Sequence, residues 1–407
     1  MKRYVVIGGG VASVGCIEGI RNVDKTSEIV LVAGEGVPVY CRPLISYYLE
    51  GKTDLEKMKY RPDDFYERMG CKLVYGKAER IDPETQTIWV DGQTIVYDEL
   101  CLATGSNPFV PPFAGLDTVP VKTGFMTRKD ALYLESVLTP TSRVLIVGAG
   151  LIGLKCAEGI AERVAKVTVC DLADRVLSSI LDAPMAARMQ KVLESHGVAF
   201  YLQNSVSRFD GSTATLQDGT KVDFDVLVTA VGVRASIGLA KGIADVDRGV
   251  LTDTKQATSA PHIYAAGDCC QGYDASIGGQ RVVAILPNAY LQGYTAGVNM
   301  AGGERVFDKG MPLNAIGFFG YHALTAGAYT GEMTEIVSGD NVKRLFIKDG
   351  RLVGFMLLGN VERAGILTAM VRERTPMDEK TPEILKNTPS LEGLSAQKRK
   401  KILGGVV

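Results

Sequence analysis

Two glycine-rich turns are the parts of this sequence best suited to binding a ligand. Their small residues are, in chain order, Gly8, Gly10 and Ser13 in the first turn, and Gly148, Gly150 and Gly153 in the second. At this spacing, the first glycine permits a tight bend, the second lets the backbone approach a pyrophosphate, and the third position lets helix and strand pack closely. The following helix presents unpaired N–H groups and its positive dipole end to phosphates. The two turns therefore predict two dinucleotide sites.

The elements around each turn follow the same order. Residues 4–7 and 144–147 are apolar strands that enter the turns, and residues 14–21 and 154–163 are helix-compatible runs that leave them. A second apolar strand follows each helix, at 28–32 and 166–170. Two such strand–turn–helix–strand units imply parallel sheets with right-handed crossovers. The fold class is therefore expected to be α/β, with two Rossmann-like dinucleotide-binding domains.

An acidic residue after the second strand of each unit indicates how a ribose would be held. Asp171 lies 23 residues past Gly148, and Glu35 follows the second strand of the first unit. A carboxylate at this place accepts a hydrogen bond from the ribose 2′-OH and repels a 2′-phosphate. The second site is therefore expected to prefer NADH to NADPH.

Length and charge limit the class of protein. A chain of 407 residues suggests two or three domains, and its net charge of −1 argues against a nucleic-acid binder. No apolar stretch reaches the roughly 18 residues that cross a membrane, and the first apolar run ends at Gly8, too early for a signal peptide. We therefore expect no membrane span and a cytoplasmic location. The eight cysteines contain no C-x-x-C pair, so neither a zinc nor an iron–sulfur site is expected.

Three further segments carry a resemblance to a known family. Residues 258–268 (TSAPHIYAAGD) resemble the second flavin motif of the pyridine nucleotide–disulfide oxidoreductase superfamily, residues 103–108 resemble its strand-to-linker signature, and residues 231–234 resemble the end of its NAD domain. The resemblance implies FAD and NAD as cofactors. It implies an FAD domain at 1–118 and 245–305, an NAD domain at 119–244, and a C-terminal α+β domain with a polar tail at 306–407. Within the last domain, the Asp349-Gly350 pair inside an alternating run predicts a hairpin.

The resemblance also implies roles for single residues. FAD would be held by Gly8, Gly10, Ser13, Glu35, Arg42, Pro43, Thr104, Gly105, Asp268 and Pro287, and NAD by Gly148, Gly150, Gly153, Asp171 and Gly232. Asp268 would bond the ribityl or pyrophosphate portion. The helix that begins near Pro287 would direct its N-terminus at the flavin pyrimidine ring and stabilise negative charge on reduced flavin.

The chain departs from the family at the redox cysteine. The C-x-x-x-x-C of the disulfide-reducing members is absent, and so is the Ser-Cys-Gly of the single-cysteine members. Aligning the latter by the Leu-Glu-Gly-Lys at 49–52 places their cysteine at Pro43, with Cys41 two residues early. The Tyr-x-Arg-Pro-x-x-Ser pattern at 40–46 instead resembles rubredoxin, ferredoxin and nitrite reductase flavoproteins, in which the flavin itself passes electrons on. A nucleophilic Cys41 remains an alternative.

A second departure is Lys155, at a point of the NAD helix where relatives usually carry glutamate. The lysine reverses the local charge, so it could pair with an acid such as Glu158 at i+3 or steady an anionic reduced flavin. Lys155 and Cys41 are therefore the two candidate catalytic side chains, and a cleft-edge cation and a packed thiol are the alternatives.

The predicted function is an FAD-dependent oxidoreductase that takes hydride from NADH to flavin N5 and passes electrons to an acceptor, which we expect to be a small redox protein such as rubredoxin. In one alternative, the protein is an NADH oxidase, a peroxidase or a coenzyme A disulfide reductase that uses Cys41 in its reaction. Another is an electron-transfer subunit of a larger complex, with residues 306–407 and the basic run at 398–401 as docking surface. A homodimer is also consistent with the sequence.

Overall fold

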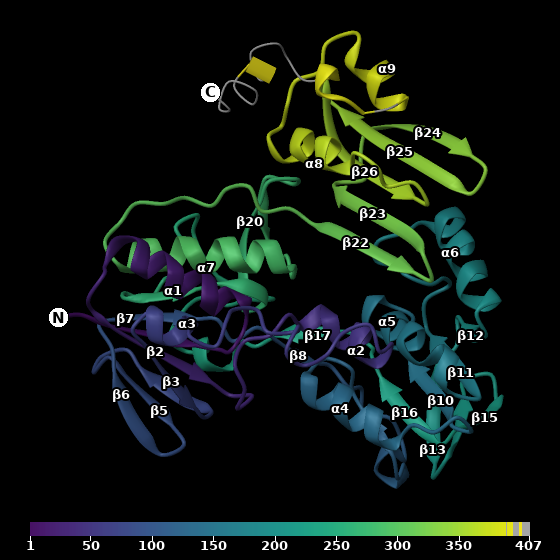
Figure 1. Cartoon of the computed structure of the whole chain (residues 1–407), viewed down its shortest axis with the longest axis horizontal. Helices are drawn as coiled ribbons and strands as arrows, with labels where there is room; N and C mark the ends of the chain where they lie inside the picture. Colours follow the sequence, from purple (N-terminus) through teal and green to yellow (C-terminus); the bar gives the residue numbers. More distant parts are fainter. Residues whose placement is uncertain (388, 394–398, 401–407) are drawn as a thin grey trace.

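The computed structural model describes residues 1–387, 389–393 and 399–400. Two parallel five-stranded sheets and one antiparallel five-stranded sheet form its framework (Figure 1). Lys398 and Lys401 of the predicted basic run lie outside the described residues. Within the described part of the chain, no helix is both long and apolar enough to cross a bilayer.

The first parallel sheet has the order β19-β7-β1-β2-β3. Its strands are β1 (Arg3–Ile7), β2 (Glu28–Ala33), β3 (Cys71–Tyr75), β7 (Glu99–Leu102) and β19 (Ile263–Ala265). Alternate side chains of β1 enter different cores. Tyr4 and Val6 pack under α1 (Val11–Val23) and α7 (Leu286–Met300), which lie side by side in Figure 1. Val5 and Ile7 pack toward the antiparallel strands β4 (Ala78–Asp82), β5 (Thr87–Val90) and β6 (Gln93–Val96).

The second parallel sheet has the order β12-β11-β10-β16-β9. Its strands are β9 (Lys122–Thr123), β10 (Arg143–Val147), β11 (Lys166–Asp171), β12 (Val198–Leu202) and β16 (Val226–Thr229). One face packs with α4 (Arg128–Val137), α5 (Leu151–Ile160) and α6 (Ala183–Ser195). The other face meets β13 (Val206–Asp210), β14 (Thr213–Leu216) and β15 (Lys221–Asp223). A two-stranded link of β8 (Ser106–Pro108) and β17 (Val233–Ala235) joins the two parallel units.

The third sheet is antiparallel, in the order β22-β23-β26-β25-β24. Its strands are β22 (Leu313–Phe318), β23 (Tyr321–Gly327), β24 (Glu332–Ser338), β25 (Asn341–Lys348) and β26 (Arg351–Leu358), followed by α8 (Ala364–Arg372) and α9 (Thr381–Lys386). Asp349 and Gly350 have φ angles of 50° and 65°, which fit a hairpin turn with both central residues left-handed. The predicted hairpin is therefore confirmed.

Shorter elements connect these sheets. They are α2 (Ile45–Leu49), α3 (Phe65–Arg68), β18 (Val250–Leu251), β20 (Cys270–Asp274) and β21 (Gly279–Arg281). The four strands predicted around the two glycine-rich turns are present as β1, β2, β10 and β11, and each pair is parallel. The α/β class is confirmed, whereas the domain boundaries at 118, 245 and 305 stay predictions.

Candidate dinucleotide sites

The first glycine-rich turn fits a pyrophosphate. Gly8 has a φ of 128°, and a Cβ there would lie 2.0 Å from the carbonyl oxygen of Ala103 at the end of the neighbouring strand, so only glycine suits this bend. Gly10 has extended backbone, and a Cβ on it would meet nothing within 4 Å in the described part of the chain. No described side chain caps α1, so its first N–H groups face this open space. Ser13 closes the turn by donating to the carbonyl oxygen of Gly10 at 2.6 Å.

Helices α1 and α7 bring their N-termini to the same end of the first sheet. A Cβ on Gly15 would lie 2.2 Å from the carbonyl oxygen of Tyr290, and one on Gly19, four residues on, would lie 2.3 Å from that of Tyr294, also four residues on. The helices therefore run parallel and almost backbone to backbone. Two positive dipole ends thus meet beside the first turn, where they favour bound negative charge.

Asp268 lies near the junction of these two helix ends, because a Cβ on the adjacent Gly267 would lie 3.1 Å from the Ala12 Cβ and 3.5 Å from the Ala289 Cβ. The Asp268 carboxylate accepts a hydrogen bond from Ser106 Oγ at 3.3 Å, and its other oxygen receives no donor from the described residues. Burial raises the pKa of Asp268, while Ser106 and Arg42 oppose that rise. A partly buried carboxylate with one oxygen available suits a hydroxyl-bearing ligand such as the ribityl chain of FAD.

Arg42, Tyr40 and Glu35 form a network beside the first turn. The Arg42 guanidinium pairs with Glu35 and donates to the Met126 carbonyl oxygen at 2.9 Å. The Tyr40 hydroxyl donates to Glu35 at 2.8 Å and accepts from Arg42 at 3.1 Å. Glu35, the predicted ribose ligand, is therefore already bonded to Arg42 and Tyr40. Pro43 follows Arg42 at the start of a short 3-10 turn, next to these groups.

Thr104 and Gly105 connect the first turn to the link between the units. The Thr104 hydroxyl donates to the Ser236 carbonyl oxygen at 2.8 Å, and the Gly105 carbonyl oxygen accepts from the Ser236 amide at 2.9 Å. Gly232, on the other side of this link, accepts at its carbonyl oxygen from the Phe109 amide at 2.9 Å. Thr104 and Gly105 therefore lie at one end of the β8–β17 link, and Gly232 lies at its other end.

The second turn repeats the geometry of the first. A Cβ on Gly148, where φ is 119°, would lie 2.2 Å from the Ala230 carbonyl oxygen, whereas Gly150 again faces open space among the described residues. Asp171 accepts from the Ala149 amide at 2.6 Å and from the Ala173 amide at 2.7 Å. The carboxylate predicted to bind ribose therefore also fixes the glycine-rich turn, and each oxygen keeps capacity for a further donor.

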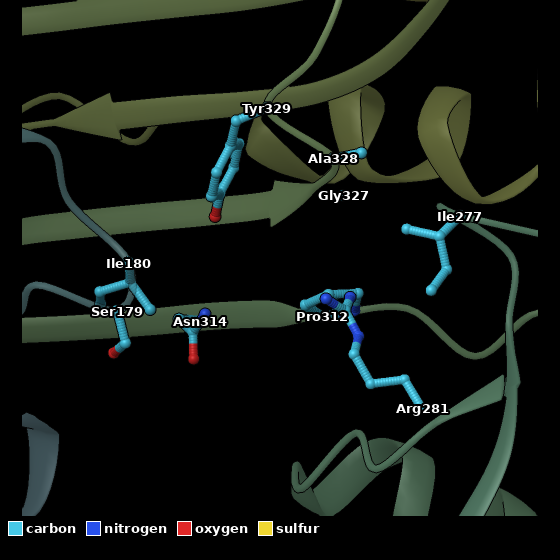
Figure 2. A pocket seen from close by; sticks show the side chains of 9 residues that line it. All are labelled: Ser179, Ile180, Ile277, Arg281, Pro312, Asn314, Gly327, Ala328 and Tyr329. Atoms are coloured by element: carbon cyan, nitrogen blue, oxygen red, sulfur yellow. The ribbon is translucent and has the colours of Figure 1, made fainter. Parts of the chain in front are cut away.

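A cavity of about 340 Å³ lies where the two parallel units and the antiparallel sheet meet. Figure 2 shows its lining residues, which are Ser179, Ile180, Ile277, Arg281, Pro312, Asn314, Gly327, Ala328 and Tyr329. The loop that carries Ser179 is tied to the second turn, because the Leu177 amide donates to the Ala149 carbonyl oxygen at 2.9 Å. Arg281 pairs with the fully buried Asp274, so the cation of this cavity has a fixed counterion.

Cys41 does not have the surroundings of a reactive thiolate. It is half-buried just before the 3-10 turn, and burial raises the pKa of its thiol, against a smaller opposing effect of the Leu44 amide. A cysteine nucleophile requires the opposite shift, which adjacent cations or a helix N-terminus produce. The other seven cysteines are free and buried.

Lys155 is nearly buried and has its charge paired within α5. Its ammonium pairs with Glu158 and donates to the Gly317 carbonyl oxygen at 3.3 Å, and it lies 4.9 Å from the centre of the Tyr47 ring. Its side chain is 17% exposed. Tyr40, Arg281, Asp274 and Asn314 were not predicted as site residues. Only Tyr40 had a nearby signal, because it belongs to the Tyr-x-Arg-Pro pattern.

Comparisons with known proteins agree with this architecture. The family model described as pyridine nucleotide-disulphide oxidoreductase matches residues 2–293. The NADH-dependent phenylglyoxylate dehydrogenase subunit epsilon of Aromatoleum evansii is 30% identical over 92% of both chains. The nitrite reductase [NAD(P)H] of Bacillus subtilis is also 30% identical, over 93% of this chain but only 48% of its own length. A solved putidaredoxin reductase–putidaredoxin complex shares the fold, with a TM-score of 0.87 and 23% identity over 95% of this chain and 96% of that chain.

Proposed function

This chain belongs to the pyridine nucleotide-disulphide oxidoreductase family, and on that basis we propose that its flavin passes electrons from NADH directly to a small redox protein. Family members are NADH-dependent flavin oxidoreductases, and FAD and NAD(H) are the cofactors of this chain. We propose further that FAD lies at the first glycine-rich turn and NADH at the second, and that no cysteine of the chain relays electrons.

FAD would be held at the first turn. The open N–H groups at Gly10 bind the pyrophosphate, Asp268 accepts a ribityl hydroxyl, and Arg42 with Glu35 borders the adenosine side. The N-terminus of α7, where Pro287 sits in the first turn, stabilises negative charge on the pyrimidine ring. Bound FAD supplies the chemistry, which is to accept hydride and release electrons.

NADH would be held at the second turn. The N–H groups at Gly150 bind its pyrophosphate, and Asp171 accepts the ribose hydroxyl and repels a 2′-phosphate. We assign the 340 Å³ cavity to the approach of the dinucleotide, because the loop lining it is bonded to this turn. The residues of the chain thereby orient the two cofactors and exclude water.

The surroundings of Cys41 are the observation that carries direct transfer. The thiol is half-buried, and burial raises its pKa, which disfavours the thiolate that would act as a nucleophile or an electron relay. Pro43, at the place of the family's redox cysteine, has no thiol at all. Lys155 is neutralised by Glu158 and is not required for hydride transfer.

A second candidate is an electron-transfer subunit of a larger complex. The name of the Aromatoleum evansii relative, which matches this chain over almost its whole length, marks it as one subunit of a dehydrogenase. This candidate requires a stable partner, so co-purification of a defined redox protein from the native source would favour it over a transient acceptor.

An acceptor panel tests the proposed function. The enzyme, reduced anaerobically with one equivalent of NADH, should be reoxidised by rubredoxin or ferredoxin at least about tenfold faster than by oxygen, peroxide or disulfides at equal concentration. Photoreduced enzyme is the control, because its reoxidation does not depend on the NADH site. Reoxidation by disulfides alone would contradict the proposal and favour a cysteine-based reaction.

A further inference from the structure

Lys155 and Glu158 form a nearly buried ion pair on one face of α5. Their side chains are 17% and 7% exposed. Both side chains of the pair also form hydrogen bonds with residues outside the helix. Lys155 Nζ also donates to the Gly317 carbonyl oxygen at 3.3 Å, and the second Glu158 oxygen accepts from the Phe319 amide at 2.7 Å. The pair therefore binds the end of β22 and the first residue of the turn that leads to β23.

The same ammonium contacts the segment that carries Arg42 and Pro43. Lys155 Nζ lies 4.9 Å from the centre of the Tyr47 ring on α2 and 5.5 Å from that of Phe318, a cation between two aromatic faces. Helix α2 packs closely on α5, since a Cβ on Gly159 would lie 3.1 Å from the Ser46 carbonyl oxygen. Helix α5, helix α2 and the end of β22 therefore meet at Lys155.

Strand β22 is anchored at both ends. Just before it begins, the Met311 carbonyl oxygen accepts from Asn288 Nδ2 in the first turns of α7 at 3.2 Å. Its far end is held by Lys155 and Glu158. Between these anchors, Pro312 and Asn314 form one wall of the 340 Å³ cavity, as Figure 2 shows.

Two neighbouring contacts attach the same sheet to α6. The Phe319 ring stacks on His196, with ring centres 3.9 Å apart and planes 4° from parallel. Arg344 on β25 pairs with Asp182, the N-cap of α6, and with Glu335. These contacts also hold the sheet close to the second parallel unit, and the stack of Phe319 on His196 lies one residue past the end of β22.

We propose that Lys155 and Glu158 are positioning residues that fix the far end of β22 and so set the wall along which NADH approaches the flavin. Lys155 acts through Gly317 and Phe319 and does not touch the nicotinamide. Because the pair is nearly buried, removal of the ammonium leaves the Glu158 carboxylate buried without its counterion, which destabilises the arrangement that holds this carboxylate against the Phe319 amide. The inference rests on the proposed function, since it uses the assignment of the cavity to NADH.

The test compares Lys155→Met with Lys155→Arg in the flavin-loaded protein, and uses the exposed Lys166→Met as matched control. Lys155→Met should raise KM for NADH about fivefold or more and change kcat less than about twofold, because it widens the approach without altering the reacting atoms. Hydrogen exchange of the Phe319 amide, measured without NADH, should become at least about tenfold faster. Lys155→Arg should restore both values toward the wild type, and Lys166→Met should change neither.

Each contrary result has a distinct meaning. Unchanged exchange at Phe319 overturns the positioning role, whatever the kinetics show. A fall in kcat of about tenfold with unchanged KM would place Lys155 at the nicotinamide and overturn the inference. Faster exchange with unchanged KM overturns the link between β22 and NADH, while the acceptor panel still decides the proposed function by itself. If Lys155→Met does not fold, Glu158→Gln carries the test, with a KM raised at least about threefold at near-constant kcat.

Discussion

Replacing Gly10 with valine should give a folded protein that purifies without its flavin. The Gly10 backbone is extended, with φ −119° and ψ −175°, so it suits a β-branched residue, and a new Cβ meets no described atom within 4 Å. The valine side chain would instead fill the space into which the uncapped N–H groups of α1 point. Losing two charge-assisted hydrogen bonds, each worth about 1.5–3 kcal/mol, should weaken FAD binding at least about 100-fold.

Bound flavin per mole of protein, read from the visible absorbance, measures this effect. Gly365→Val is the matched control, because Gly365 also has open surroundings among the described residues but lies on α8, far along the chain. The control should remain fully yellow, and circular dichroism should show both variants folded. A Gly10→Val protein with a full complement of flavin would contradict the placement of FAD at the first turn.

Replacing Gly150 with valine should impair the binding of NADH and leave the binding of FAD unchanged. Gly150 has the same local geometry, with φ −84° and ψ −173°, and the same open surroundings in the described structure. This variant should stay yellow and accept electrons from dithionite as the wild type does. Its flavin should be reduced by limiting NADH at least about 100-fold more slowly, because the blocked groups hold the NADH pyrophosphate.

The Gly10→Val and Gly150→Val proteins serve as controls for each other. A Gly150→Val protein that loses its flavin and a Gly10→Val protein that keeps it would mean that the two assignments are exchanged. Loss of flavin from both would mean that the turns support the fold in a way that the open space around each glycine does not suggest.

The sequence predicted those elements whose signals are local. Strands β1, β2, β10 and β11 are continuous apolar runs next to glycine-rich turns, and the β25–β26 hairpin follows from an Asp-Gly pair between alternating residues. The i+3 spacing of Lys155 and Glu158 likewise made their pairing on one helix foreseeable. In each case the signal lies within one short stretch of consecutive residues.

Features that depend on distant segments could not be predicted in this way. Arg281 and Asn314 reach the same cavity from different sheets, and the contact of Glu158 with the Phe319 amide spans 161 residues. No spacing rule relates such positions, because they meet only after the sheets have packed. The role of Glu35 is predicted from its place after a strand and that of Arg42 from a resemblance, whereas their ion pair and its partner Tyr40 appear only in the folded structure.

The central claim is that no sulfur atom carries electrons between the flavin and its acceptor. The most direct measurement is rapid-mixing anaerobic reduction of a Cys41→Ser variant by NADH, followed by reoxidation with rubredoxin or ferredoxin. Because burial raises the pKa of the Cys41 thiol and disfavours its thiolate, both rates should equal those of the wild type within about twofold. A fall of about tenfold or more in either rate, with flavin content unchanged, would show that Cys41 takes part and would contradict the account.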